Sequence, residues 1–173
     1  MAHALSDTEI NPYGLDPIDE LPHAPIAVPN WTEHYFFFGY DAVADVAIDI
    51  HIGREPQAPD IWRAVIGVAG GGDRLLLAKY YGRDGSDVGP GAGPLRIECL
   101  EPFRRWRLRV DGLLEVASRG AASDRLHPSS HVVPLAFDLI CEAATPFWDL
   151  VRSRMGSFDL DQTHADAQSS PHW

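Results

Sequence analysis

Residues 30–40, NWTEHYFFFGY, place six aromatic rings in eleven residues. Aromatic side chains favour β-strands, in which successive side chains point to opposite faces. One face would carry Trp31, Glu33, Tyr35 and Phe37, and the other would carry His34, Phe36, Phe38 and Tyr40. Because both faces are mostly apolar, we expect either a strand covered on both sides or one face that lines a pocket. A carboxylate and an imidazole among rings need partners, and this mixture is typical of a cavity for an apolar ligand with one polar group.

Length, composition and charge limit the classes of protein that this chain can belong to. With 173 residues, of which 45% are hydrophobic, the chain is long enough for one core. The formal net charge of −11 argues against binding nucleic acid or docking by charge on an anionic membrane. The sequence shows no basic start followed by an apolar run and no stretch of about 20 apolar residues, so we predict no signal peptide and no membrane span. We expect a cytoplasmic protein.

Cysteine and histidine usage predicts neither a disulfide framework nor a metal site. Cys99 and Cys141 each end an alternating apolar segment, so we expect buried, reduced thiols. Asp49 and His51 lie two apart on one expected strand face, but no third ligand follows at metal-binding spacing, and we predict no metal. The glycine-rich residues 82–93 lack the spacing of a phosphate-binding loop, and no cofactor is predicted.

Turn residues divide the chain into an arm, a β domain and a tail. Residues 1–30 are rich in proline, which fixes φ and removes a hydrogen-bond donor, so we predict an extended arm without regular structure. Residues 31–145 alternate strand and turn patterns, which indicates an all-β, antiparallel barrel or strongly bent sheet. The expected strands are 31–40, 44–53, 61–70, 73–81, 94–101, 104–112, 113–119 and 132–143.

The tail carries the one pattern that favours a helix. Within Pro146–Phe158, the apolar residues Phe147, Leu150, Val151 and Met155 fall roughly on one helical face. Residues 146–173 are therefore predicted to form a short C-terminal helix followed by a polar tail or linker.

The clearest register surrounds Trp106. Trp106, Leu108 and Val110 alternate with a row of arginines, so the apolar set faces a core and the arginines face outward. On the preceding strand Glu98 lies opposite the apolar positions and would pair with an arginine across the strands. Trp106 is the residue most strongly expected in the core.

Acid chemistry is the reaction class that these residues favour. Glu33 and Asp49 lie on strands that we expect to be neighbours, and a carboxyl in an apolar cavity is pushed toward its neutral, proton-donating form. No Lys or Arg lies between Asn30 and Asp49, which favours Glu33 over Asp49 as the acid. The alternative is that both acids face solvent or pair with arginines such as Arg54 or Arg63. The residues expected to line the ligand site are Trp31, Tyr35, Phe37, His51 and Trp62.

Four segments together resemble a known family. They are DELPH (residues 19–23), NWTEHYFF (30–37), HIGREP (51–56) and LRIECLEPFRRWR (95–107). They are similar to the N-terminal half of hydroxyneurosporene synthase-like proteins, the carotenoid 1,2-hydratase and tocopherol cyclase-related group. The resemblance covers roughly residues 16–145 and implies a lipocalin-like β-barrel. It also implies an apolar isoprenoid or steroid-like ligand and proton-initiated hydration or cyclisation of an alkene.

Two departures from the family pattern keep the activity open. His51 stands where a basic residue is expected, and the Arg-Asp-His-Ser-Trp-Gly type motif of the family's second domain is absent. The chain is therefore expected to be a hydratase or cyclase that needs a second domain, or a non-catalytic module that binds a lipid. A non-catalytic module would pair with a second barrel domain or with itself as a homo-oligomer.

Overall fold

The computed structural model describes residues 5–27, 29–70, 74–118, 131–143 and 145–146. Its strands form a single antiparallel sheet, which confirms the all-β prediction. The strands are β1 (Glu33–Asp41), β2 (Val46–Glu55), β3 (Ala58–Gly70), β4 (Arg74–Gly82), β5 (Gly91–Ala92), β6 (Leu95–Glu101), β7 (Arg105–Ser118) and β8 (Val132–Glu142).

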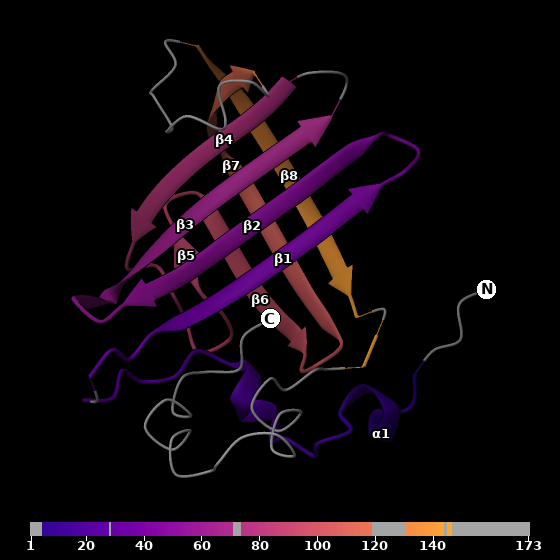
Figure 1. Ribbon diagram of the computed structural model, residues 1–173, viewed down its shortest axis with the longest axis vertical. Coiled ribbons are helices and arrows are strands. Elements are labelled where there is room, and N and C mark those ends of the chain that lie inside the picture. Colours follow the sequence, from indigo (N-terminus) through magenta and orange to yellow (C-terminus); the bar gives the residue numbers. More distant parts are fainter. Residues whose placement is uncertain (1–4, 28, 71–73, 119–130, 144, 147–173) are drawn as a thin grey trace.

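The sheet runs in the order β1-β2-β3-β4-β7-β6-β5, and β8 pairs with the other edge of β7. Strands β1 to β4 form one layer, and β6, β7 and β8 cross behind it (Figure 1). The sheet is therefore strongly bent, because rings from its two halves meet inside: the ring centroids of Tyr35 and Trp106 lie 5.6 Å apart. In the described part of the chain β1 and β8 do not pair with each other, so the sheet is not closed.

Strand β7 joins the two halves of the sheet. Its first residues pair with β6, its last residues pair with β4, and β8 lies along most of its length. The predicted division into separate strands at 104–112 and 113–119 is wrong, because Asp111 and Gly112 continue the ladder opposite Ala136 and Leu135. Gly112 serves close packing instead: a Cβ there would lie 2.7 Å from Pro94 Cγ, so glycine lets the neighbouring loop approach.

Alternation along the strands builds one main core between the two layers. Its buried residues are Tyr35, Ile50, Ile52, Trp62, Ala64, Ile66, Ala92, Leu95, Ile97, Trp106, Leu108, Val110 and Leu114. Trp106 is 7% exposed, which confirms its predicted place in the core. The arginine row faces outward and is paired, since Arg107 bonds Asp138 across the strands and Arg109 lies 3.2 Å from Glu98.

The N-terminal arm is less extended than predicted. It contains a helix, α1 (Asp7–Ile10), and a 3-10 helix, η1 (Pro17–Glu20). Ser6 and Asp16 cap them, each within a capping box that satisfies the free amides of the first turn. Pro17 stands at the start of η1, where its fixed φ suits a helix. Local capping thus gives regular structure to a proline-rich segment.

Two further predictions concern helices: the C-terminal helix and a membrane span. The helix predicted for Pro146–Phe158 lies outside the described residues except for Pro146. Among the described residues, no helix has the length and apolar character needed to cross a membrane.

Candidate functional site

An open pocket of about 370 Å³ lies at the seam, the gap between the unpaired strands β1 and β8. This seam pocket brings together side chains from β1, from the turn between β6 and β7, and from the end of β8. Its lining residues are Phe36, Phe37, Phe38, Phe103, Arg104, Trp106, Cys141, Glu142, Ala143, Thr145 and Pro146.

Strand β1 supplies one aromatic wall of the seam pocket. Phe37 points into the bent sheet, where its ring lies 5.7 Å from that of Trp106. Phe36 and Phe38 lie on the opposite face of β1, with their rings stacked 6.5 Å apart. Because β1 is the last strand of the sheet, rings from both of its faces reach its free edge.

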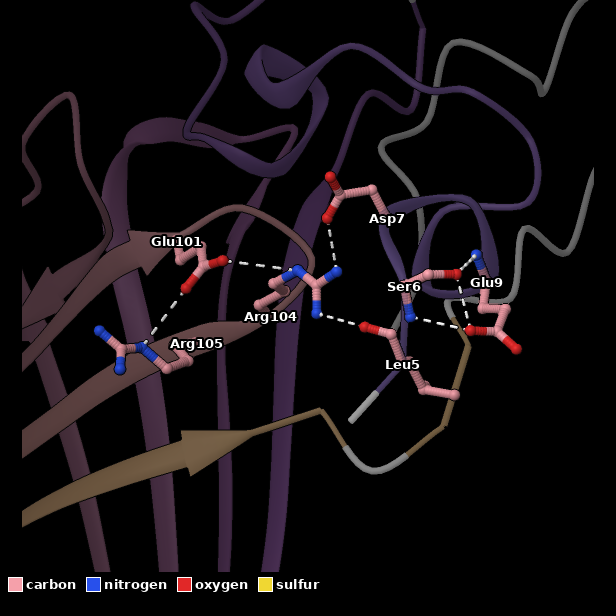
Figure 2. Close-up of polar contacts among 7 residues, drawn as sticks. All are labelled: Leu5, Ser6, Asp7, Glu9, Glu101, Arg104 and Arg105. Carbon is pink, nitrogen blue, oxygen red and sulfur yellow. Dashed lines mark hydrogen bonds and ion pairs between the residues drawn. The ribbon is translucent and has the colours of Figure 1, made fainter. Parts of the chain in front are cut away.

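The turn between β6 and β7 supplies the second wall. Phe103 occupies it with a left-handed φ of 61°, and its ring is buried. Beside it, the Arg104 guanidinium is held by the arm: it donates to Leu5 O at 3.0 Å and to Asp7 Oδ1 at 2.6 Å, and it lies 3.4 Å from Glu101 (Figure 2). Arg104 therefore lies at the rim of the pocket, and Asp7 and Glu101 neutralise its charge.

A buried carboxyl stands directly behind this wall. Glu20, at the end of η1, is 1% exposed. Its Oε2 accepts hydrogen bonds from the Phe103 amide at 3.1 Å and from Trp106 Nε1 at 3.2 Å. No partner for Oε1 is found in the described part of the chain. Burial raises the pKa of Glu20 to about 7, against the smaller effect of these two hydrogen bonds.

Glu33 lies in a different environment from the one that the sequence predicted. Its carboxyl is fully buried, and Oε1 accepts from the backbone N–H and from Nδ1 of His23, each at 2.9 Å. Its Oε2 accepts a hydrogen bond from Arg54. Burial acts to raise the pKa of Glu33, but the His23 hydrogen bonds and the Arg54 charge outweigh it and hold the pKa below 4.5. The structure therefore shows the alternative interpretation, in which Glu33 pairs with Arg54, and not the neutral, proton-donating carboxyl.

The Arg54 guanidinium packs against two tryptophans that were predicted to bind the ligand. Its guanidinium carbon is 5.0 Å from the ring centroid of Trp31 and 4.3 Å from that of Trp62. Arg54 also donates to the carbonyls of His23 and Pro59, which ties the arm to the sheet. Trp31, Trp62 and Tyr35 are all buried, and in the structure they pack this ion pair and the core.

Asp49 and His51 lie on the outer face of β2, away from Glu33. The expectation that Glu33 and Asp49 occupy neighbouring strands is confirmed, but Asp49 pairs with Phe38 in register and Glu33 pairs with Arg54. His51 Nε2 lies 2.8 Å from His34 Nδ1, and its ring stacks on Phe36 at 4.1 Å. Burial, reinforced by Arg63, lowers the pKa of His51.

The outer face of β1 to β4 carries a second hollow of about 540 Å³. Its lining residues are Phe38, Gly39, Tyr40, Ala47, Ile48, Asp49, Gly67, Ala69, Leu75 and Leu77. Phe38 is 71% exposed and Tyr40 is 66% exposed at its rim. Asp49 thus lies beside an open apolar surface.

The two cysteines flank Trp106 in the ladder, Cys99 from β6 and Cys141 from β8. Both are free and only partly buried. Burial raises the pKa of each, that of Cys99 to about 12, which keeps the thiols protonated. In the described residues no three His, Cys, Asp or Glu side chains are grouped as metal ligands.

Sequence reasoning missed Glu20 and Phe103. It named Arg54 as a possible partner of the acids, and the register of the β1–β2 hairpin places Arg54 opposite Glu33. Glu20 carried no such signal, since its hydrogen-bond donors lie 83 and 86 residues further along the chain. No protein-family model, curated protein or solved structure matches this chain, so the resemblance to the hydroxyneurosporene synthase-like family remains a prediction from the sequence.

Proposed function

We propose that this chain is a lipocalin-like domain that binds an apolar molecule, of isoprenoid or steroid-like character, in the seam pocket. The observation that carries the proposal is the composition of this pocket. Four phenylalanines and Trp106 gather where the described strands β1 and β8 leave the bent sheet open. Ligand sites are typically concave, mostly apolar and about 300–1,000 Å³ in volume, and the seam pocket has about 370 Å³.

Binding is supported better than acid catalysis by Glu33. An acid that protonates an alkene must hold its proton until the ligand is bound. Glu33 is instead an ionised partner of Arg54 and His23, with a lowered pKa. It also lies among side chains that fill the inside of the sheet, whereas the seam pocket is lined by other residues. We therefore propose a ligand carrier or the ligand-binding half of an enzyme.

The test is a fluorescence titration of the purified chain with farnesene, an isoprenoid hydrocarbon. Trp106 lines the pocket, so occupancy should change tryptophan emission in a saturable way. Phe36→Ala should weaken binding about tenfold, equivalent to about 1.4 kcal/mol, because Phe36 lines the seam pocket and not the outer hollow.

Tyr40→Ala is the matched control. Tyr40 is an aromatic residue on the same face of β1, but it lines the outer hollow and not the seam pocket. Its replacement should leave farnesene affinity unchanged. Equal losses in the two variants, or no saturable change in the wild type, would overturn the proposal.

A second candidate function is docking of another β-barrel domain or a second copy of this chain on the outer face. It is favoured by the exposed apolar residues around the outer hollow and the nearby turn, of which Val43 is 98% exposed. Sedimentation velocity of the wild type and of Tyr40→Ser would test self-association. A monomer at all concentrations would exclude a second copy as the partner.

A further inference from the structure

Two cross-strand rows of side chains build the outer hollow. They cross β1 to β4, the four strands that form one layer (Figure 1), and in each row one residue from every strand lies opposite its neighbours in register. Residues that are opposite in an antiparallel ladder point to the same face. The rows are Phe38-Asp49-Gly67-Leu77 and Tyr40-Ala47-Ala69-Leu75. Each row therefore starts at an aromatic ring, crosses two smaller side chains and ends at a leucine.

The small residues in the middle of the two rows explain why this face is hollowed. Neighbouring strands lie about 4.8 Å apart, so β1 and β4 are about 14 Å apart. A Cβ at Gly67 would lie 3.8 Å from Asp49 Cβ and from Leu77 Cδ2, which is ordinary contact, so packing does not require a glycine there. Gly67 leaves the floor open, and the resulting volume of about 540 Å³ is that of a small-molecule site.

Asp49 brings a negative charge to this apolar hollow. Among the described residues that line it, Asp49 alone is charged, and its side chain is exposed. The two cations on the same face of β3 and β4 are engaged elsewhere: Arg63 lies 3.2 Å from Glu55, and Lys79 lies 5.7 Å from the ring centroid of Tyr81. In the described part of the chain Asp49 therefore has no ion-pair partner.

The surroundings of Asp49 favour a cation. His51, two residues along β2, supplies no charge at neutral pH, because burial and Arg63 lower its pKa. Phe38 lies opposite Asp49, and both Phe38 and Tyr40 are exposed at the rim, where the faces of aromatic rings attract positive charge. The net charge of −11 also attracts cations to the molecule from a distance.

We propose that the outer hollow binds a small apolar amine, with its ammonium group beside Asp49 and its apolar body between the rings of β1 and the leucines of β4. This site is distinct from the proposed ligand site, since the two share only Phe38 among their described lining residues. The carboxylate and the ring faces would select a cation over a neutral molecule of the same shape, whereas the apolar walls would bind both.

The experiment compares 1-adamantylamine with 1-adamantanol, which have the same apolar cage and differ in charge, because an aliphatic amine is protonated at neutral pH. Isothermal titration calorimetry of the full chain at pH 7 measures both affinities. Salt at about 0.15 M reduces the Debye length to about 8 Å and so limits attraction by distant charges. The wild type should bind the amine about tenfold more tightly than the alcohol.

Asp49→Asn is the decisive variant, because it removes the charge and keeps the shape of the side chain. It should weaken binding of the amine about fivefold and leave binding of the alcohol unchanged. Asp111→Asn is the matched control: Asp111 is an exposed aspartate on β7, outside the hollow, and its replacement removes the same charge. Equal losses in the two variants would assign the attraction to the net charge and overturn the proposal.

Gly67→Val tests the location of the site independently. Valine suits a strand, and its side chain would fill the floor of the hollow, so the amine and the alcohol should both bind more weakly. Unchanged affinity for the amine in Gly67→Val would place the amine elsewhere and overturn the proposal. The proposal is also overturned if the wild type does not bind the amine, or if it binds the alcohol equally tightly.

Discussion

Two buried glutamates fasten the arm to the sheet, and their environments are opposite. Glu33 meets a guanidinium, an imidazole and a backbone amide, so its carboxyl is held as an anion. Glu20 meets an indole N–H and a backbone amide, with no cation, so its carboxyl is held close to neutrality. Both are less than 2% exposed, which shows that burial alone does not decide the protonation of a carboxyl. A carboxylate that accepts charge-assisted bonds is a structural anchor, and one without a cation is available for proton chemistry.

Arg54→Met gives the largest expected effect, because it leaves the Glu33 carboxylate buried without its cation. Breaking a buried ion pair by removing one partner typically costs about 3–5 kcal/mol. Urea unfolding at pH 7 measures the loss. The matched control is Arg83→Met, whose ion pair with Asp60 is exposed and worth about 1 kcal/mol or less.

The double variant Glu33→Met, Arg54→Met sharpens this result. Removing both charges should recover part of the stability lost in Arg54→Met, because no uncompensated charge remains. A loss below about 1 kcal/mol in Arg54→Met would show that Glu33 is not the ionised anchor that its contacts indicate.

The pH dependence of stability should separate the two glutamates. The folded pKa of Glu20 is raised above 4.5, so its neutral form stabilises the fold fully below about pH 4.5, and this contribution is lost as the pH rises through about 7. Glu33 has the opposite sign: its contribution is present above 4.5 and is lost only as the pH falls through its lowered pKa.

Glu20→Gln isolates the contribution of Glu20 to the pH dependence of stability. The stability of the wild type relative to Glu20→Gln should fall by about 3 kcal/mol between pH 4.5 and pH 8.5, from a pKa raised from 4.5 to about 7. Urea unfolding at several pH values measures the difference, in which the titration of His23 cancels because both proteins contain it. A difference that is constant with pH would show that Glu20 titrates normally.

Two Trp→Phe substitutions test the tryptophan contacts of Glu20 and of the Glu33–Arg54 pair. Trp106→Phe keeps a ring in the core but removes the N–H that Glu20 accepts, and loss of such a hydrogen bond to a buried group costs about 1–3 kcal/mol. Trp62→Phe weakens the ring contact with Arg54, an interaction worth about 0.5–2 kcal/mol. Only Trp106→Phe should change the pH dependence of stability above pH 6, and a change of equal size in both variants would contradict the assignment.

His23→Ala should have the smallest effect. It removes one side-chain hydrogen bond to Glu33, while the His23 backbone N–H and Arg54 remain, so the loss is about 1 kcal/mol. The bond to Glu33 raises the pKa of His23, so the loss should be full below pH 6.5 and should decrease as the pH rises through the raised value. Thermal unfolding at pH 5.5 and pH 9 measures the trend, and a larger loss at pH 9 would contradict it.

Most of the sheet could be predicted, because the sequence patterns that indicate strands are local. Alternation of apolar and polar residues placed Trp106 inside and paired Glu98 with the arginine row, as the structure shows. The predicted break between strands 104–112 and 113–119 was wrong because a glycine such as Gly112 marks either a turn or a close approach of the backbone to a neighbouring loop. Local patterns do not distinguish the two.

The protonation of the candidate site could not be predicted because it depends on partners distant in the chain. The absence of nearby cations in the sequence favoured a neutral Glu33, with pairing to an arginine such as Arg54 as the alternative, and the structure shows that Arg54 reaches Glu33 across the β1–β2 hairpin. Glu20 received no attention because the donors that isolate it, Phe103 and Trp106, belong to the opposite half of the sheet. Burial and charge at a point are properties of the assembled fold.

The long sequence separation between Glu20 and its hydrogen-bond donors also affects the order in which contacts form during folding. During synthesis the arm and the aromatic strand β1 leave the ribosome before Phe103 and Trp106, which follow Glu20 by 83 and 86 residues. Contacts of such separation form late, because the intervening chain must first be ordered. We expect the β1–β2 hairpin to gain protection from hydrogen exchange before the Phe103 amide does in pulse-labelled refolding. The arm would then dock last, because Glu20 has its two hydrogen-bond donors only after β7 is correctly placed.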